Sequence, residues 1–363
     1  MTTADDLSAH VRDALGPHLA AGKVHDLTVD GAGAVAFAFL LNRDDPATLV
    51  RDVRKAVQAV PGVTNVKITV QDARAPQKPG ARPAPAAGSV PPPPTPEEMP
   101  ALGRVLAVSS GKGGVGKSTV SANLAAALAR QGHSVGLMDA DIYGPNIPRM
   151  FGVDGKPEVQ GGKIQALEAH GVKLMSLGFI VERDAPAIWR GPIIMKIIQQ
   201  FLRDVAWGTL DYFLVDLPPG TGDAQLSLTQ SIHLHGALIV TTPQEMAVGD
   251  SLRGAKMFER VGVSVLGIVE NMSYYVCPHC HERSQVFLAG GGQRLADELG
   301  VPLLAQIPLQ AGMPDLADAG RPIVVAEPES PAGQALDALA RRVADALIAR
   351  PGAPRAPLST SAR

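Results

Sequence analysis

The segment from Gly111 to Ser118 reads GKGGVGKS and carries two lysines, although a phosphate-binding loop requires one. It matches the pattern G-x-x-x-x-G-K-[ST], with an apolar, strand-like run before it and a helix-like run after it. In such loops the glycines let backbone N–H groups point at phosphates, and the N-terminus of the next helix adds partial positive charge. The segment therefore predicts a nucleoside triphosphate site and leaves the role of the first lysine, Lys112, open.

The loop residues have separate expected contacts with ATP. We expect Lys117 to reach the β- and γ-phosphates, Ser118 to ligate Mg²⁺, and Thr119 to help hold the α-phosphate. A glycine-rich turn without a ligand is the alternative, which the flanking strand and helix disfavour. The residues expected to contact ATP are Gly111, Lys112, Gly113, Gly114, Val115, Gly116, Lys117, Ser118 and Thr119.

Three aspartates follow apolar runs that read as strands. Asp139 and Asp141 lie in LMDADIYGPN, and Asp216 lies in YFLVDLPPGTGD. Ligands of a doubly wound sheet bind at the carboxyl ends of its strands, so Asp216 is predicted to join Ser118 at the magnesium ion. Hydrolysis also needs a group that orients water against the γ-phosphate, and Asp141 or Asp139 is expected to do this. A helix cap or a solvated loop is the alternative for each aspartate.

Cys277 and Cys280 form a C-x-x-C pair and are the only cysteines of the chain. Two nearby thiols in a protein expected to be cytoplasmic point to metal or redox chemistry rather than to a disulfide framework. A closed iron–sulfur or zinc site generally takes four ligands, so a four-thiolate site requires two chains. A twofold dimer would bring both pairs around one centre.

Other interpretations of CPHCH stay open at this stage. Zinc is one, held by four thiolates of two chains or by Cys277, Cys280 and either His279 or His281. The stretch also satisfies C-x-x-C-H, the c-type haem attachment pattern, but the chain shows no export signal. A thioredoxin-like redox pair is disfavoured because no helix obviously begins at Cys277 to lower its pKa. An inert surface loop is the last alternative.

The composition and charge of the chain bear on which partners and which compartment to expect. The formal net charge is −2 and aromatic residues make up 4%, which gives no general attraction to nucleic acid or anionic membranes. No apolar run reaches the roughly 18 residues of a membrane helix. The N-terminus has no apolar stretch typical of a signal peptide. We therefore expect a cytoplasmic protein with neither a membrane nor a nucleic-acid partner.

The chain divides at a Pro- and Ala-rich stretch, residues 73–100, which predicts an extended linker. Residues 1–72 predict a small α+β domain in the order α-β-β-α-β, with Asp45 as N-cap of a helix whose first turn holds Pro46. Residues 101–349 alternate apolar strands with helices, which predicts a doubly wound, mostly parallel α/β domain. Residues 350–363 read as a disordered tail.

The expected strands of the larger domain are near-continuous apolar runs, typical of a parallel sheet buried on both faces. A helix over STVSANLAAALARQG follows the phosphate loop, and a last helix carries a stripe of Leu336, Leu339, Val343 and Leu347. The strand candidates are RVLAVSS, SVGLMDAD, YFLVDLP, GALIVTTP, VLGIVENM and PLLAQIPL.

Four motifs together resemble the Mrp/ApbC-type iron–sulfur cluster carriers, a branch of the deviant Walker A P-loop ATPases: KGGVGKST, DADIYGPN, DLPPGTGD and CPHC. WRGP at Trp189–Pro192 is also similar to a family segment, and the match runs from about Leu102 to Ala349. The resemblance implies ATP hydrolysis to ADP and phosphate, and transfer of clusters received from scaffold proteins to apo iron–sulfur proteins. The N-terminal domain resembles one found in some bacterial members that is similar to iron–sulfur assembly factors.

The resemblance also implies a homodimer with two ATP molecules at its interface. In such dimers Lys112 crosses to the partner's ATP, as an arginine finger does. The resemblance further implies a 4Fe–4S cluster that bridges the subunits through Cys277 and Cys280 of both chains. Asn271 and Pro308 are implied as adenine contacts, where a turn asparagine and a loop proline are the plain alternatives.

Two other functions belong to relatives of the same ATPase class. A spatial-organisation ATPase of the Min or partition type would need a terminal membrane helix or a basic DNA-binding face, and neither the Pro-rich tail nor the net charge favours it. An electron-transfer ATPase like the nitrogenase iron protein would retain its cluster. A zinc-bridged P-loop ATPase is the third alternative.

Overall fold

The computed structural model describes residues 4–30, 33–42, 45–46, 48–72, 96–141, 144–180, 191–220, 222–280 and 282–349. The chain forms two compact units, Met1–Val90 and Pro91–Arg363. Their division falls inside the stretch expected to be a linker, of which residues 73–95 lie outside the described residues, as does the expected tail. No helix in the described part is both long and apolar enough to cross a membrane.

The smaller unit has a three-stranded sheet in the order β1-β2-β3, with β1 antiparallel and β3 parallel to β2. The first helix of the expected α-β-β-α-β order is divided into two, α1 and α2, because Pro17 has no N–H to continue the ladder. Its core includes Val11, Phe39 and Val57. The elements are α1 (Ala4–Ala14), α2 (Gly16–Ala20), β1 (Val24–Val29), β2 (Ala34–Leu41), α3 (Leu49–Gln58) and β3 (Asn65–Asp72).

The expected N-cap at Asp45 is wrong. Helix α3 begins at Leu49 behind Thr48, and its cap position has no side-chain hydrogen bond. Asp45 instead pairs with Lys23 and accepts the Asn42 N–H at 2.8 Å, and the Lys23 contact is the main cause of its lowered pKa. A cation within reach offers the carboxylate a stronger, charge-assisted bond than a helix N–H does.

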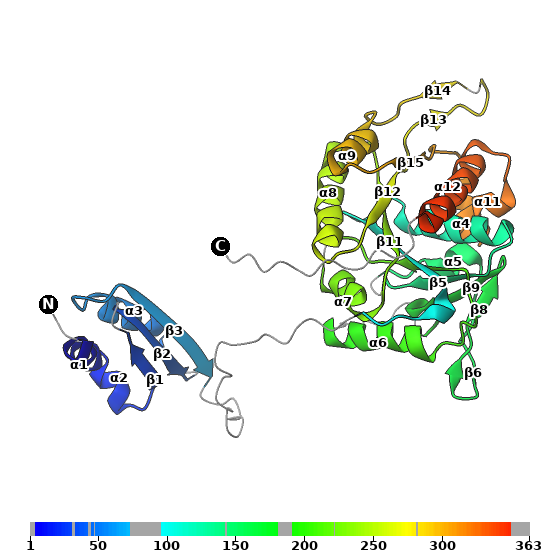
Figure 1. Ribbon diagram of the computed structural model, residues 1–363. Helices are drawn as coiled ribbons and strands as arrows, with labels where there is room; N and C mark the ends of the chain where they lie inside the picture. Colours follow the sequence, from blue (N-terminus) through cyan, green and yellow to red (C-terminus); the bar gives the residue numbers. More distant parts are fainter. Residues whose placement is uncertain are drawn as a thin grey trace. The chain divides into compact units, whose positions relative to one another are not determined.

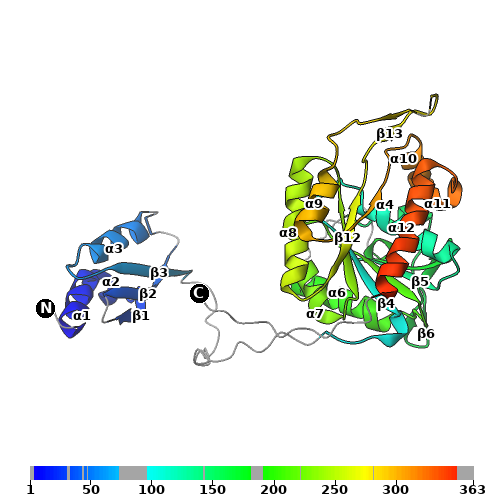
Figure 2. The same cartoon turned by 45° about the horizontal axis from the view of Figure 1, so that its top comes forward.

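The larger unit is built on an eight-stranded sheet in the order β15-β12-β11-β4-β10-β5-β9-β8 (Figures 1 and 2). Its strands run parallel except β8, which pairs antiparallel with β9 at one edge. All six apolar runs expected as strands are present, so the doubly wound α/β prediction is confirmed. The strands are β4 (Arg104–Ser110), β5 (Val135–Asp139), β8 (Leu167–Ala169), β9 (Val172–Ser176), β10 (Tyr212–Asp216), β11 (Gly236–Thr241), β12 (Val265–Glu270) and β15 (Leu303–Gln306).

Helices cover both faces of this sheet, with α4 and α12 on one side and α6, α7 and α8 on the other (Figures 1 and 2). Two short antiparallel pairs, β6–β7 and β13–β14, lie outside the sheet. The α-helices are α4 (Lys117–Arg130), α5 (Ile147–Phe151), α6 (Gly191–Asp204), α7 (Asp223–Ser231), α8 (Glu245–Arg260), α9 (Gly291–Leu299), α10 (Met313–Asp318), α11 (Ile323–Ala326) and α12 (Pro331–Ile348). The short strands are β6 (Val159–Gln160), β7 (Lys163–Ile164), β13 (Tyr275–Val276) and β14 (Arg283–Ser284).

Alternate residues of β4 explain its unbroken apolar run. Leu106 and Val108 belong to the core on the α4 and α12 side, whereas Val105 and Ala107 belong to the core on the other side. A strand buried on both faces cannot alternate apolar with polar residues. The stripe predicted on the last helix is buried in the first of these cores.

The end of the expected linker packs on the larger unit. Glu97 bridges to Ile232 and pairs with Arg203 at 2.6 Å, and Leu102 is buried in a short 3₁₀ turn, Pro100–Leu102. The structure therefore places residues 97–100 with the ATPase-like unit rather than with a free segment.

We expect Leu339→Ala to lower the free energy of unfolding of the larger unit by about 3 kcal/mol, because Leu339 is fully buried between α12 and the sheet. Urea unfolding followed by tryptophan fluorescence reports on this unit alone, since both tryptophans, Trp189 and Trp207, lie in it. Ile348→Ala is the matched control: its side chain is 62% exposed on the same helix, and its loss should change stability by under about 0.5 kcal/mol. Equal effects of the two substitutions would contradict this packing.

Candidate nucleotide site and cysteine hairpin

Three strand ends bring the predicted acids together. Asp216 ends β10 beside Asp139, which ends β5, and Asp139 is in turn level with Ser176 at the end of β9. The phosphate loop follows the neighbouring strand β4 on the same edge. Parallel strands thus deliver residues far apart in sequence to one edge, as the fold class implies.

The phosphate loop needs its glycines for two reasons. Gly114 and Gly116 have φ values of 80° and 81°, which glycine adopts without strain. A Cβ on Gly111 would lie 2.1 Å from the carbonyl carbon of Asp250 in α8, so only glycine fits against that helix. Helix α4 begins at Lys117, directly behind Gly116. The expected strand, loop and helix are therefore all present.

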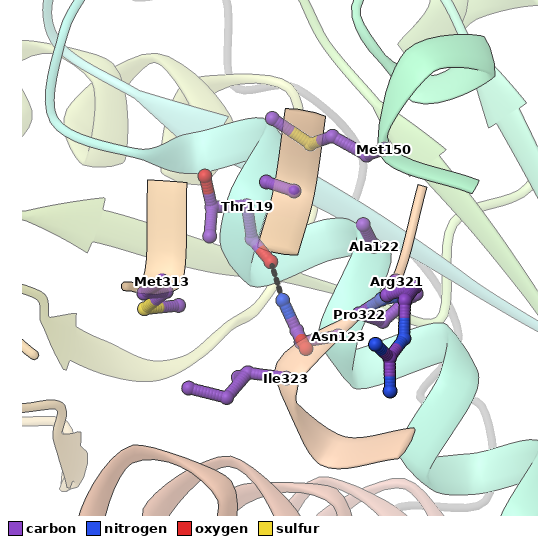
Figure 3. A pocket seen from close by; sticks show the side chains of 9 residues that line it. Thr119, Ala122, Asn123, Met150, Met313, Arg321, Pro322 and Ile323 are labelled. Carbon is purple, nitrogen blue, oxygen red and sulfur yellow. Dashed lines mark hydrogen bonds between the residues drawn. The ribbon is translucent and has the colours of Figure 1, made fainter. Parts of the chain in front are cut away.

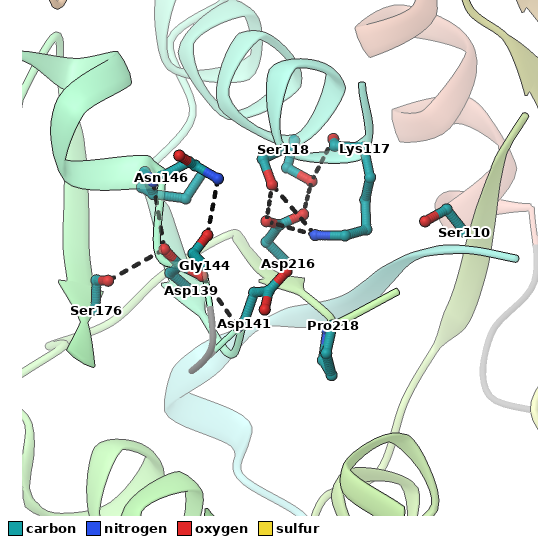
Figure 4. A network of polar contacts seen from close by, with 12 residues as sticks. Ser110, Lys117, Ser118, Asp139, Asp141, Gly144, Asn146, Ser176, Asp216 and Pro218 are labelled. Atoms are coloured by element: carbon teal, nitrogen blue, oxygen red, sulfur yellow. Dashed lines mark hydrogen bonds and ion pairs between the residues drawn. The ribbon is translucent and has the colours of Figure 1, made fainter. Parts of the chain in front are cut away.

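A buried polar network joins the loop to Asp216 (Figure 4). The Lys117 Nζ lies 2.8 Å from Asp216 Oδ2, and both side chains are almost fully buried. Ser118 Oγ donates to the same oxygen at 2.6 Å, and Ser121 Oγ donates to Asp216 Oδ1 at 2.6 Å. Two predicted magnesium ligands, Ser118 and Asp216, are thus in direct contact, while the lysine expected on the phosphates is paired with the acid.

Asp139 is buried, and both of its oxygens accept hydrogen bonds. Oδ1 accepts the Asp141 N–H at 3.0 Å; Oδ2 accepts the Ser176 hydroxyl at 3.1 Å and the Ile147 N–H at 3.3 Å. Burial, and secondly the neighbouring Asp216 carboxylate, raise the pKa of Asp139 to about 7. Of the two residues expected to orient water, Asp139 is enclosed, whereas Asp141 is half-buried on the loop that Asp139 holds.

Lys112 is half-buried, and its backbone carbonyl accepts the Ser110 hydroxyl at 3.1 Å. Within the described ranges, no carboxylate lies within ion-pair distance of its ammonium group. The two lysines therefore have different environments. Lys117 pairs with the buried Asp216, whereas Lys112 has no such partner among the described residues.

Asn271 has a contact that its motif did not reveal. Its Nδ2 donates to the Val115 carbonyl of the phosphate loop at 2.9 Å, and a Cβ on Gly116 would meet that Nδ2 at 2.2 Å. The side chain thus clamps the loop backbone. Pro308, the other residue implied at adenine, is buried just after β15. Contact of either residue with adenine stays a prediction.

One pocket lies beside α4, one turn past the phosphate loop (Figure 3). Thr119, expected at the α-phosphate, is on its wall, and the Thr119 carbonyl accepts Asn123 Nδ2 at 2.9 Å. Met150 of α5, Met313 of α10 and Arg321 line it as well. Sequence reasoning missed this pocket because its walls come from helices far apart in the chain.

Cys277 and Cys280 lie in the turn between β13 and β14, where the Cys277 N–H donates to the Glu282 carbonyl at 3.0 Å. The hairpin stands away from the sheet, beyond the end of β12 (Figures 1 and 2). Both thiols are free; Cys280 is exposed and Cys277 is half-buried. Hydrogen bonds from the backbone N–H groups of Cys280 and His279 lower the pKa of Cys277, which favours the thiolate that binds metals.

This geometry bears on the alternatives for the cysteines. No helix begins at Cys277, as expected, yet the turn itself lowers the thiol pKa, so the absence of a helix does not argue against reactivity. Among the described residues, no three His, Cys, Asp or Glu side chains gather as a metal site. His281, Trp189 and Arg190 lie outside the described residues, as does the side chain of Pro192.

Comparison with known proteins decides the family. Residues 101–344 match the family model of ParA type described as NUBPL iron-transfer P-loop NTPase. The chain belongs to this family. An iron–sulfur cluster carrier protein of Synechocystis is 46% identical over 332 residues, which is 88% of this chain and 90% of the relative. The iron–sulfur cluster transfer protein NUBPL of the mouse is 45% identical over 261 residues, 70% of this chain and 82% of that protein.

Solved structures support the same P-loop NTPase fold. A nucleotide-binding protein of Archaeoglobus fulgidus in complex with ADP has a TM-score of 0.56 and 42% identity, over 64% of this chain and 90% of that one. The cell division ATPase MinD of Pyrococcus furiosus has a TM-score of 0.53 and 26% identity, over 67% of this chain and 99% of that one. As a member of the NUBPL family, the chain is a P-loop NTPase.

We expect Asp139→Asn to alter how stability depends on pH. An acid whose pKa is raised from 3.8 to about 7 holds its proton more tightly in the folded state. Its contribution is therefore fully present at low pH and is lost as pH rises through about 4 to 7. Asparagine mimics the protonated acid, so the stability of the variant relative to wild type should improve by at least about 1 kcal/mol between pH 4 and pH 8.

Urea unfolding without nucleotide or magnesium measures this, followed at each pH by tryptophan fluorescence. Asp141→Asn is the control from the same loop, because no comparable burial encloses that side chain. A difference between Asp139→Asn and wild type that stays constant with pH would show that folding does not raise the pKa of Asp139.

Proposed function

We propose that this protein is an ATPase that carries iron–sulfur clusters and delivers them to apo iron–sulfur proteins. The proposal rests on two free thiols in the same unit as a complete phosphate loop. Cys280 is exposed, and Cys277 is half-buried and has a lowered pKa. The names of the relatives, iron–sulfur cluster carrier and transfer proteins, support it. Scaffold proteins are the proposed donors of the cluster.

ATP binding requires the buried network to change partners. Lys117 leaves Asp216 for the β- and γ-phosphates, which offer a stronger negative charge. The loop N–H groups from Gly111 to Thr119 and the start of α4 hold the phosphates. Asn271, which contacts the loop at Val115, and Pro308 are proposed at the adenine end.

Ser118 and Asp216, which Lys117 contacts in this structure, are the proposed ligands of Mg²⁺. Ser118 and Asp216 present a hydroxyl and a carboxylate oxygen to each other at 2.6 Å, and hard oxygen ligands are those that Mg²⁺ prefers. When bound, the ion neutralises charge on the β- and γ-phosphates. Asp141 is the proposed water-orienting residue, and Asp139 holds its loop through the Asp141 and Ile147 N–H groups.

Two shortfalls within one chain support a homodimer. Cys277 and Cys280 supply two thiolates where a 4Fe–4S cluster takes four ligands, so we propose that two chains share the cluster. Lys112 has no acid of its own chain in ion-pair reach among the residues described, so we propose that it inserts at the partner's ATP. A cation at developing charge stabilises the transition state of phosphoryl transfer.

We expect Lys112→Ala to bind ATP with near-normal affinity and to hydrolyse it about 100-fold or more slowly, as loss of a charge-stabilising group does. Equilibrium binding of a fluorescent ATP analogue and phosphate release measure the two quantities. Lys156→Ala, which removes an exposed lysine away from the loop, should match wild type in both. Normal hydrolysis by Lys112→Ala would exclude the cross-subunit role.

We expect wild-type protein reconstituted anaerobically to take up iron and sulfide, and the double variant Cys277→Ala/Cys280→Ala to take up none, because it lacks every thiolate of the chain. Iron, zinc and sulfide analysis with mass measurement by light scattering records the content and the oligomer. Ser284→Ala, an exposed change in the same hairpin, should load like wild type. Zinc without sulfide would identify a zinc-bridged ATPase instead, and iron uptake by the double variant would remove the cysteines from the site.

A further inference from the structure

Glu270 is a buried carboxylate at the end of β12 that the proposed chemistry of ATP does not use. Its Oε1 accepts the Ser273 hydroxyl at 2.6 Å and Gln306 Nε2 at 3.0 Å. Its Oε2 accepts the backbone N–H of Gly292 in a short hydrogen bond. A buried carboxylate is costly unless its oxygens are satisfied, and here three donors converge on it.

Two of these donors bracket the cysteine segment. Ser273 stands just before β13, and Gly292 is in the first turn of α9, which follows the hairpin. Between them the chain makes one excursion, which includes both cysteines; its first residues, Tyr274 and Tyr275, also pair with Leu309 behind β15. Glu270 therefore holds both ends of that excursion with one side chain.

The far end of the excursion is fitted closely to Glu270. A Cβ on Gly292 would lie 2.7 Å from the Glu270 Cβ, and one on Gly291 would lie 2.3 Å from the Pro243 carbonyl oxygen. Only glycine allows α9 to begin so near the strand. The negative charge of Glu270 also faces the positive end of the helix dipole.

The residue next to Glu270 is fixed to the phosphate loop. Asn271 donates through Nδ2 to the Val115 carbonyl and through its backbone N–H to the Thr241 carbonyl at 2.8 Å. Met272, between Asn271 and Ser273, has a φ of 55°, which is uncommon for a side chain of its kind. The backbone is thus held on both sides of Met272: by the phosphate loop through Asn271, and by Glu270 through Ser273.

We propose that Glu270 is a positioning residue that transmits the state of the phosphate loop to the cysteine hairpin. A shift of Val115 on nucleotide binding moves Asn271, and Glu270 passes that shift to both ends of the hairpin through Ser273 and Gly292. The proposal rests on the proposed function, since it concerns how ATP affects the cluster-binding thiols. A simple anchor for α9 would need the same contacts but would not make the thiols respond to nucleotide.

The chain carries its own reporter, because its only two thiols are those of the hairpin. Cluster-free, reduced, full-length protein is treated with a chromogenic disulfide reagent, with and without magnesium and a slowly hydrolysed ATP analogue. We expect the analogue to change the rate of thiol modification of wild type by about fivefold or more, the range of a typical coupling between sites. In Glu270→Gln the change should fall below about twofold, because an amide cannot accept at both positions.

Ser273→Ala removes only the hydroxyl link to the near end of the hairpin and serves if Glu270→Gln does not fold; it should also weaken the response. Gln293→Ala is the matched control, since Gln293 lies one residue past Gly292 and bonds only to Asp297 among the contacts described for its side chain. It should respond like wild type.

Binding of the analogue is measured separately for every variant by fluorescence titration. Bound analogue with unresponsive wild-type thiols, or a full response in both Glu270→Gln and Ser273→Ala, would overturn the proposed route. Absence of binding in wild type would instead refute the proposed ATPase function, and absence of iron uptake would refute cluster carriage. These failures are thus distinguishable.

Discussion

The site depends on the buried ion pair between Lys117 and Asp216. Neither charge is tolerable alone in that position, because an unpaired buried charge costs several kcal/mol. Three donors of α4, from Lys117, Ser118 and Ser121, meet one carboxylate of β10, so a single acid fixes the start of the helix that the apolar core holds on the sheet. Any ligand that takes Lys117 must supply compensating charge at once. In the proposed function, phosphate oxygens and a divalent cation would do this together, which would link ATP binding to magnesium binding.

The neighbouring acid shows why the network is arranged as it is. Asp139 is level with Asp216, and two carboxylates this close do not both ionise readily. Lys117 pairs with Asp216 and not with Asp139. The oxygens of Asp139 instead accept backbone N–H groups of the loop that carries Asp141. The two acids of DADIYGPN thus have different environments. Asp139 is buried and fixes the loop, whereas Asp141 is half-buried on that loop.

The sequence is sufficient wherever periodicity or a local motif determines the structure. Buried parallel strands are continuous apolar runs, so β4 and its neighbours are predictable, as are α4 and the stripe on α12. Contacts between side chains distant in sequence are not. The sequence misleads at Asp45 because Lys23, in another element, competes for it. The contact of Asn271 with the phosphate loop and that of Glu270 with α9 give no signal in the sequence, because the partners there, Val115 and Gly292, are backbone groups. The antiparallel β8 edge escapes prediction because three residues are too few to show a period.

One edge of the sheet carries all of these parts in order: Ser176, Asp139 and Asp216 on one side of the phosphate loop, and Glu270 with Gln306 on the other. In the proposed function the first group lies at the phosphates and magnesium, and the second holds the hairpin. Because the phosphate loop lies between them and touches Asp216 through Lys117 and Asn271 through Val115, we expect a change in the nucleotide to act on both groups. The sheet between the two groups is rigid and allows its strands little independent movement, so we expect the response to be confined to the side chains and loops at its edge.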